Sequence, residues 1–149
     1  MRQRLVLFIA PTLGLALLDF AVKERLPTSE WLLHERSAAW VGLSVALLLG
    51  CFALAALSSR LVAAMASVTA AGALGNLISA GRHGAVPNPL RIGGSSGIAF
   101  NLADVFVVGG LLLLVGALAS ISVRHRDRLI PPRRWERKLV RWVRRQPGR

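Results

Sequence analysis

The sequence predicts an all-α membrane protein, a bundle of four transmembrane helices with small extramembrane segments on the outer side. Of its 149 residues, 54% are hydrophobic. The mean hydropathy of +0.53 is too apolar for an ordinary soluble domain. Four runs approach the about 20 apolar residues that a helix needs to cross a bilayer. These runs cover roughly residues 5–22, 40–57, 61–78 and 102–123.

The first apolar run is expected to stay in the protein as a helix. Arg2 and Arg4 precede it, as basic residues precede the apolar core of a secretory signal peptide. However, Asp19, Phe20 and Lys23 lie where the small residues of a cleavage site belong, and three more apolar runs follow. We therefore count this run as the first of four spans.

The positions of the basic residues predict the orientation in the membrane. The formal net charge is +12, and basic residues that flank spans are retained on the cytoplasmic side. Arg2 and Arg4 lie before the first run, Arg60 lies in the short second connection, and a basic tail follows the last run. Both termini are thus expected in the cytoplasm, which an even number of spans allows. Two segments then lie outside, about residues 23–39 and 79–101.

The chain is expected to divide into a membrane domain, residues 1–123, and a basic cytoplasmic tail, residues 124–149. Trp135 and Trp142 lie among the arginines of this tail, with apolar residues at helical spacing. This pattern favours an amphipathic helix on the anionic inner leaflet of the membrane. Basic tails also occur in nucleic-acid-binding proteins, but the tryptophans favour the membrane surface, and no nucleic-acid partner is expected.

The two outer segments and the third run differ in composition. The third run is dense in alanine and glycine, which lets helices approach closely, so it is expected to be the central helix. The second outer segment is rich in glycine, proline and serine. It is therefore expected to be a loop with a short extended piece rather than a regular helix.

Two aspartates lie inside apolar sequence, Asp19 in the first run and Asp104 in the fourth. A charge in a membrane span costs about 3 kcal/mol by insertion scales, so such residues are candidates for a functional site. Lys23 follows Asp19 by four residues and would share its helix face, either as an ion pair at the end of the span or as part of a site. Asn101 lies three residues before Asp104, and Asn76 ends the third run. These polar groups are expected to converge near the outer boundary, although Asn101 could also cap the fourth helix.

Four motifs resemble those of lipoprotein signal peptidase, the signal peptidase II family. They are D-x-x-x-K at 19–23, G-A-L-G-N at 72–76, His83-Gly84, and F-N-L-A-D at 100–104. The resemblance implies an intramembrane aspartic endopeptidase of the bacterial cytoplasmic (inner) membrane, with a four-helix bundle and a small β-cradle. It implies cleavage of the signal peptide from diacylglyceryl-prolipoproteins, so the partners would be this peptide and its diacylglyceryl lipid. It implies neither a metal nor an organic cofactor.

The same resemblance identifies where this chain departs from the family. Asp104 matches one of two aspartates that share a catalytic water, and Asn88 stands where the second belongs. An amide cannot exchange a proton as a carboxyl does, so the acid/base pair is incomplete. Ser79-Ala80 replaces an Asp-Arg pair, and Glu35-Arg36-Ser37-Ala38 replaces an Asn-x-Gly-Ala motif. The remaining matches are expected to bind substrate or lipid or to support the site: Asp19, Lys23, Asn76 and Asn101.

Three functions are compatible with these residues. The first is a working peptidase with an altered dyad, in which Glu35 either replaces the missing carboxylate or pairs with Arg36 or Arg82 in solvent. The second is a non-catalytic homologue that binds lipidated signal peptides as a chaperone or regulator. The third is a structural or transport-associated membrane protein with its aspartates on an ion path. The third is the weakest, because the second and third runs contain no charged residues.

Overall fold

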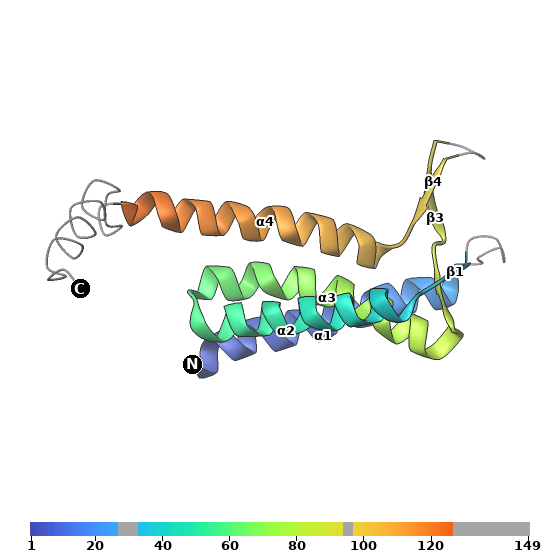
Figure 1. Ribbon diagram of the computed structural model, residues 1–149, viewed down its shortest axis with the longest axis horizontal. Helices are drawn as coiled ribbons and strands as arrows, with labels where there is room; N and C mark the ends of the chain where they lie inside the picture. Colours follow the sequence, from blue (N-terminus) through green and yellow to red (C-terminus); the bar gives the residue numbers. More distant parts are fainter. Residues whose placement is uncertain (27–32, 94–96, 127–149) are drawn as a thin grey trace, which may run out of the picture. The chain divides into compact units, whose positions relative to one another are not determined.

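The computed structural model describes residues 1–26, 33–93 and 97–126. Within these residues, four helices are long and apolar enough to cross a membrane (Figure 1), which confirms the predicted fold class. They are α1 (Arg2–Arg25), α2 (Ala38–Leu57), α3 (Arg60–His83) and α4 (Leu102–Arg124). Residues Met1–Ala117 form one compact unit, which contains all the residues of the site described below.

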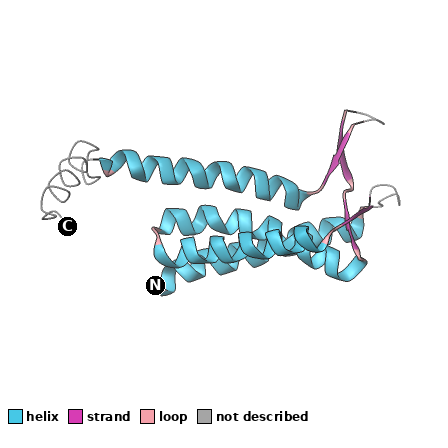
Figure 2. Cartoon of the chain, viewed as in Figure 1, coloured by secondary structure: helices cyan, strands magenta, loops and turns pink. Residues whose placement is uncertain are grey.

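Serine residues begin two of these helices. Ser37 precedes α2, and its hydroxyl accepts a hydrogen bond of 3.2 Å from the backbone N–H of Trp40. Ser59 precedes α3 in the same way and accepts from Val62 at 3.3 Å. Each serine thus satisfies a backbone donor that the first helical turn leaves free. Since α2 ends at Leu57 and α3 begins at Arg60, the two helices form an antiparallel hairpin (Figure 2).

Helix α3 is the most buried of the four. In its most apolar 18-residue window 61% of the residues are buried, against 11 to 22% in the other three helices. Most of its buried residues are small, namely alanine, glycine, serine or threonine, which allows this burial. An added Cβ on Gly110 of α4 would lie 2.6 Å from the Thr69 hydroxyl, so glycine is needed where α4 approaches α3. The composition of the third run had predicted this central position.

The second outer segment differs in part from its prediction. Residues 79–83 continue α3 rather than forming a loop, because no residue ends the helix before Gly84. Gly84 has a φ of +69°, the left-handed conformation that glycine commonly adopts after a helix. The Ser79 hydroxyl donates a hydrogen bond to the Gly75 carbonyl one turn earlier, which is compatible with a helix.

Four short strands complete the outer segments. Composition alone predicted one short extended piece, and the family resemblance implied a small β-cradle. They are β1 (Leu33–Glu35), β2 (Ala85–Pro87), β3 (Leu90–Ile92) and β4 (Ile98–Phe100). Strand β1 pairs antiparallel with β2, with Leu33 opposite Pro87. Strand β3 pairs antiparallel with β4, with Leu90 opposite Phe100. The predicted amphipathic helix of the tail, including Trp135 and Trp142, lies outside the described residues.

Candidate active site

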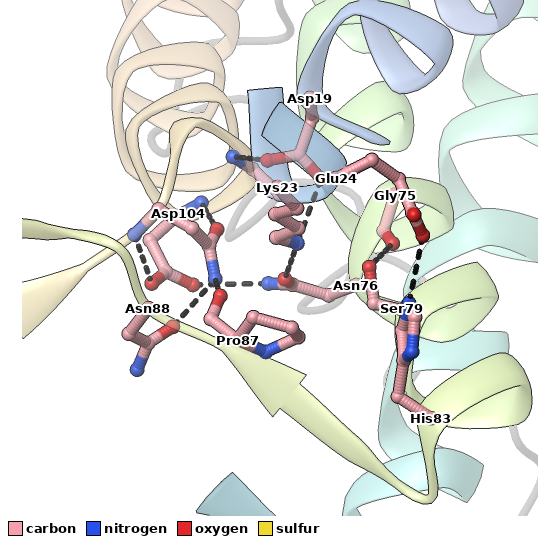
Figure 3. Close-up of polar contacts among 12 residues, drawn as sticks. Asp19, Lys23, Glu24, Gly75, Asn76, Ser79, His83, Pro87, Asn88 and Asp104 are labelled. Carbon is pink, nitrogen blue, oxygen red and sulfur yellow. Dashed lines mark hydrogen bonds and ion pairs between the residues drawn. The ribbon is translucent and has the colours of Figure 1, made fainter. Parts of the chain in front are cut away.

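A buried polar network joins three helices at one end of the bundle. The Lys23 ammonium lies 2.7 Å from Asp19 Oδ2, one helical turn away on α1, and their side chains are 1% and 0% exposed. Lys23 Nζ also donates a hydrogen bond of 2.8 Å to Asn76 Oδ1 on α3. Asn76 Nδ2 in turn donates to Asp104 Oδ1 on α4 at 2.9 Å (Figure 3). Asp19, Lys23, Asn76 and Asp104 therefore meet. The sequence had predicted that Asn76 and Asp104 converge and that Asp19 and Lys23 share a helix face.

Asp19 holds the first turn of α4 with its second carboxylate oxygen. Asp19 Oδ1 accepts a hydrogen bond of 2.8 Å from the backbone N–H of Ala103. The N-terminus of a helix carries a partial positive charge, which favours a carboxylate there. Gly75 leaves the space that Asp19 needs, because an added Cβ on Gly75 would lie 2.7 Å from Asp19 Oδ2. This close approach explains the second glycine of the G-A-L-G-N motif.

Asn101 and Asp104 cap α4 reciprocally. Asn101 Oδ1 accepts from the backbone N–H of Asp104 at 2.9 Å, and Asp104 Oδ2 accepts from the backbone N–H of Asn101 at 3.2 Å. This is the arrangement of a capping box. Asn101 is thus the cap that the sequence suggested, and it also belongs to the polar network. Both oxygens of Asp104 accept hydrogen bonds, the role that an ionised carboxylate fills.

Asn88 joins this network through Asn101. Asn101 Nδ2 donates to Asn88 Oδ1 at 2.7 Å and to the Pro87 carbonyl at 3.3 Å. Asn88, which lies between Pro87 and Pro89, is only 4% exposed. Figure 3 shows its amide nitrogen turned away from Asp104. In this bond with Asn101, Asn88 uses only the side-chain oxygen, an atom that aspartate also has.

Asp104 borders an apolar groove between α2, α3 and α4. The groove has a volume of about 410 Å³, and Asn76 and Asp104 form its polar end. The other lining residues are Trp40, Leu43, Ser44, Leu47, Ala73, Val107 and Val108. On its other side Asp104 borders a second hollow of about 440 Å³, next to Phe100 and Val105. The carboxylate is thus half-buried between two apolar spaces.

The outer segments contribute residues that sequence reasoning had not placed. The Arg36 guanidinium lies 4.9 Å from the centre of the Trp40 ring, which lines the groove. Arg82, a possible partner for Glu35, instead lies 3.5 Å from Glu24. The backbone of Glu35 pairs with Ala85, but its side chain is outside the described residues. Whether Glu35 replaces the missing carboxylate therefore stays a prediction.

The fold and this network together define a multi-pass membrane protein with a carboxylate held inside a helical bundle. A sequence profile of the family described as signal peptidase (SPase) II matches residues 17–120, or 104 of the 149 residues. The chain belongs to the signal peptidase II family, and it is a bacterial membrane protein.

Two solved structures have a similar fold. Both are titled "Bacterial membrane enzyme structure by the in meso method", one at 2.3 Å and the other at 1.9 Å resolution. The first has a TM-score of 0.62 and 16% identity, and the similarity covers 83% of this chain and 91% of that one. The second has a TM-score of 0.60 and 18% identity, with 74% and 90% covered. No curated protein sequence matches this chain.

Proposed function

We propose that this chain binds the signal peptides of diacylglyceryl-prolipoproteins in the manner of its family, and that Asn88 prevents efficient cleavage. The observation that carries this proposal is the pair of hydrogen bonds that Asn101 makes, one to Asn88 and one to Asp104. They hold residue 88 close to Asp104, where a second catalytic carboxyl would belong. The rest of the network is complete without it.

The chemistry of a two-aspartate peptidase explains the expected loss. One carboxylate takes a proton from the attacking water, and the other carboxyl, kept protonated by its charged neighbour, donates to the reacting peptide. Asp104 can serve as the base and hold the water. Asn88 has no exchangeable carboxyl proton, and positioned proton transfer typically contributes about 10² to 10⁴ in rate.

The groove supports the proposal that substrate binding is retained. Its polar end contains Asp104, and its walls are apolar residues of α2 and α4. A signal peptide with a lipid anchor presents apolar surface next to the peptide bond to be cut. Such a ligand would place its apolar part along Leu43, Leu47 and Val107, with the reacting bond at the carboxylate.

The test is a cleavage assay with purified full-length protein in detergent and a diacylglyceryl-prolipoprotein. The Asn88→Asp variant keeps the oxygen that accepts from Asn101, so we expect it to fold and to cleave at least about 100-fold faster than the unmodified protein. The shortened product is measured on a gel, with an active family member as positive control. Asp104→Asn added to this variant should abolish the gain.

Two outcomes would contradict the catalytic part of the proposal. If the unmodified protein cleaves as fast as the Asn88→Asp variant, Asn88 does not limit hydrolysis and the chain is a working peptidase. If the variant stays inactive even with Ser79→Asp and Ala80→Arg added, while the control enzyme cleaves, the site has lost more than one carboxyl.

The second candidate function is binding without cleavage, as a chaperone or regulator of lipidated precursors. Ser79 favours it, because its buried hydroxyl donates to the Gly75 carbonyl of its own helix and does not replace the aspartate that the family has there. Co-purification of an uncleaved, lipidated precursor with the unmodified protein would support this function. Equal recovery of a precursor that lacks the lipid would contradict it.

A further inference from the structure

Arg36 has a buried donor for which the described part of the chain offers no hydrogen-bond acceptor. It lies between β1 and Ser37, the residue that precedes α2. Its Nε is buried and has no hydrogen-bond partner among the described residues. An unsatisfied buried donor costs about 1–3 kcal/mol, and more when it is charged. This cost points to an acceptor that belongs to a ligand.

The other described cations near this end of the bundle differ from Arg36. Lys23 is paired with Asp19, and Arg82 lies within 3.5 Å of Glu24. The side chain of Arg25, the last residue of α1, is exposed. Arg36 and Arg91 are therefore the described cations of this region with a buried guanidinium nitrogen that has no hydrogen-bond partner, and Arg36 is the one whose guanidinium lies over Trp40 of the groove.

The position of Arg36 connects it to the groove. Its guanidinium lies 4.9 Å from the centre of the Trp40 ring, and Trp40 lines the groove. Arg36 also directly precedes Ser37, the cap of α2, and this helix carries Trp40, Leu43 and Leu47 of the groove. A guanidinium stacked on an aromatic ring keeps its in-plane N–H groups available for an anion.

The groove is also open on the outer surface of the helix bundle. Leu43 on one wall is 73% exposed and Val108 on the other is 61% exposed. In a membrane these side chains face lipid, since α2 and α4 are long and apolar enough to span it. A lipid can therefore enter from the side, with its acyl chain between the two helices.

We propose that this groove binds a membrane glycerophospholipid, with the phosphodiester on Arg36 and an acyl chain along Leu43, Leu47 and Val107. Guanidinium groups form strong, often bidentate hydrogen bonds with phosphate. Trp40 lies in the first turn of α2. At the ends of membrane spans tryptophan is enriched at the boundary between headgroups and acyl chains. The diacylglyceryl group of a prolipoprotein has no phosphate, so this ligand differs from the substrate of the proposed function and does not depend on cleavage.

The test measures lipid binding by the purified full-length protein in detergent, without any peptide. The probe is a phosphatidylglycerol with a fluorescent acyl chain. Unlabelled phosphatidylglycerol, or diacylglycerol with identical chains, is added to compete with the probe for the groove. We expect phosphatidylglycerol to compete at least about tenfold better, the range of a charged hydrogen bond. Arg36→Gln should remove this preference, and Arg36→Lys should keep part of it.

Two further variants separate the site from general effects. Arg25→Gln removes the same charge at the same end of the bundle and should leave binding unchanged. Ser44→Phe fills the groove and should weaken the binding of both lipids. Equal competition by the two lipids, or an equal loss in the Arg25→Gln and Arg36→Gln variants, would overturn the proposal. Thermal unfolding of each lipid-free variant verifies that it is folded.

Discussion

Lys23 is the residue that connects the two aspartates. It contacts Asp19 directly and reaches Asp104 through the amide of Asn76. A buried ion pair contributes little net stability, because taking both charges out of water is costly. Removing one partner is different, since it leaves the other charge buried without compensation. The pair is thus better understood as a fixed support for the orientation of Asn76 than as a source of stability.

This interpretation predicts a strong effect of a single change. Lys23→Met leaves the Asp19 carboxylate with the Ala103 N–H as its one hydrogen-bond donor among the described residues, so the free energy of unfolding should fall by about 3–5 kcal/mol. The double variant Asp19→Asn/Lys23→Met should be clearly more stable than Lys23→Met alone. Denaturant titration in detergent measures both. Arg25→Met in the same helical turn, but exposed, is the control and should change stability by less than about 0.5 kcal/mol.

The sequence located most of the site because polar residues are conspicuous in apolar runs. Asp19 and Lys23, and Asn101 and Asp104, are spaced so that each pair shares a helix face. The contacts between elements could not be predicted in the same way. The bond from the Ala103 N–H to Asp19 joins residues 84 positions apart, and it forms only because the fold brings the first turn of α4 to Asp19. Arg36 was missed because a cation in an outer segment is ordinarily solvated.

At the scale of elements, two glycines of α3 allow its neighbours to approach. Gly75 makes room for the Asp19 carboxylate of α1. Gly72 does the same for α4, since an added Cβ would lie 2.7 Å from the Val107 backbone nitrogen. The two glycines are three residues apart and serve different partner helices. The G-A-L-G part of the motif is therefore a packing requirement of the site.

A matched set of alanine variants tests this requirement. Gly72→Ala and Gly75→Ala should each lower the free energy of unfolding by about 1–3 kcal/mol, because the added methyl group overpacks the contact. Gly14→Ala is the control, since nothing lies within 4 Å of a Cβ added there. It should be neutral or slightly stabilising, by up to about 1 kcal/mol. Equal destabilisation by all three would show that helix packing at α3 is not the cause.

The ends of the elements were the least predictable part of the fold. Gly81 favoured a loop at residues 79–83, yet the helix tolerates it, and a Cβ added there would meet nothing within 4 Å. Composition alone underpredicted the strands, which the family resemblance implied, because each has three residues and is too short for a recognisable alternation of polar and apolar side chains. Pairing between distant segments, as of β1 with β2, forms them.

For the whole molecule, the position of the site at one end of the bundle matters. Arg4 donates a hydrogen bond to the Ser58 carbonyl, so the N-terminus lies beside the connection between α2 and α3. Asp19 and Lys23 lie near the other end of α1. The basic residues Arg2, Arg4 and Arg60 lie at the first end and predict that it faces the cytoplasm. The site would then be reached from the outer side of the membrane.

Cysteine labelling tests this orientation. In intact cells, a membrane-impermeant maleimide should label the Ile98→Cys variant, whose position is 78% exposed in β4. It should not label Ser58→Cys until the cells are permeabilised. Native Cys51 is 2% exposed within α2 and should give little background. The reverse labelling pattern would show that the site faces the cytoplasm.

The proline after Asn88 affects how long Asn88 keeps its side-chain amide. Asparagine can deamidate spontaneously to aspartate when the N–H of the following residue attacks the side chain and closes a cyclic imide. Pro89 has no backbone N–H, so this route is closed at residue 88. An ageing copy of the protein will therefore not acquire the missing acid by this chemistry. Conversion of this position to aspartate would need direct hydrolysis of the side-chain amide or a change in the gene.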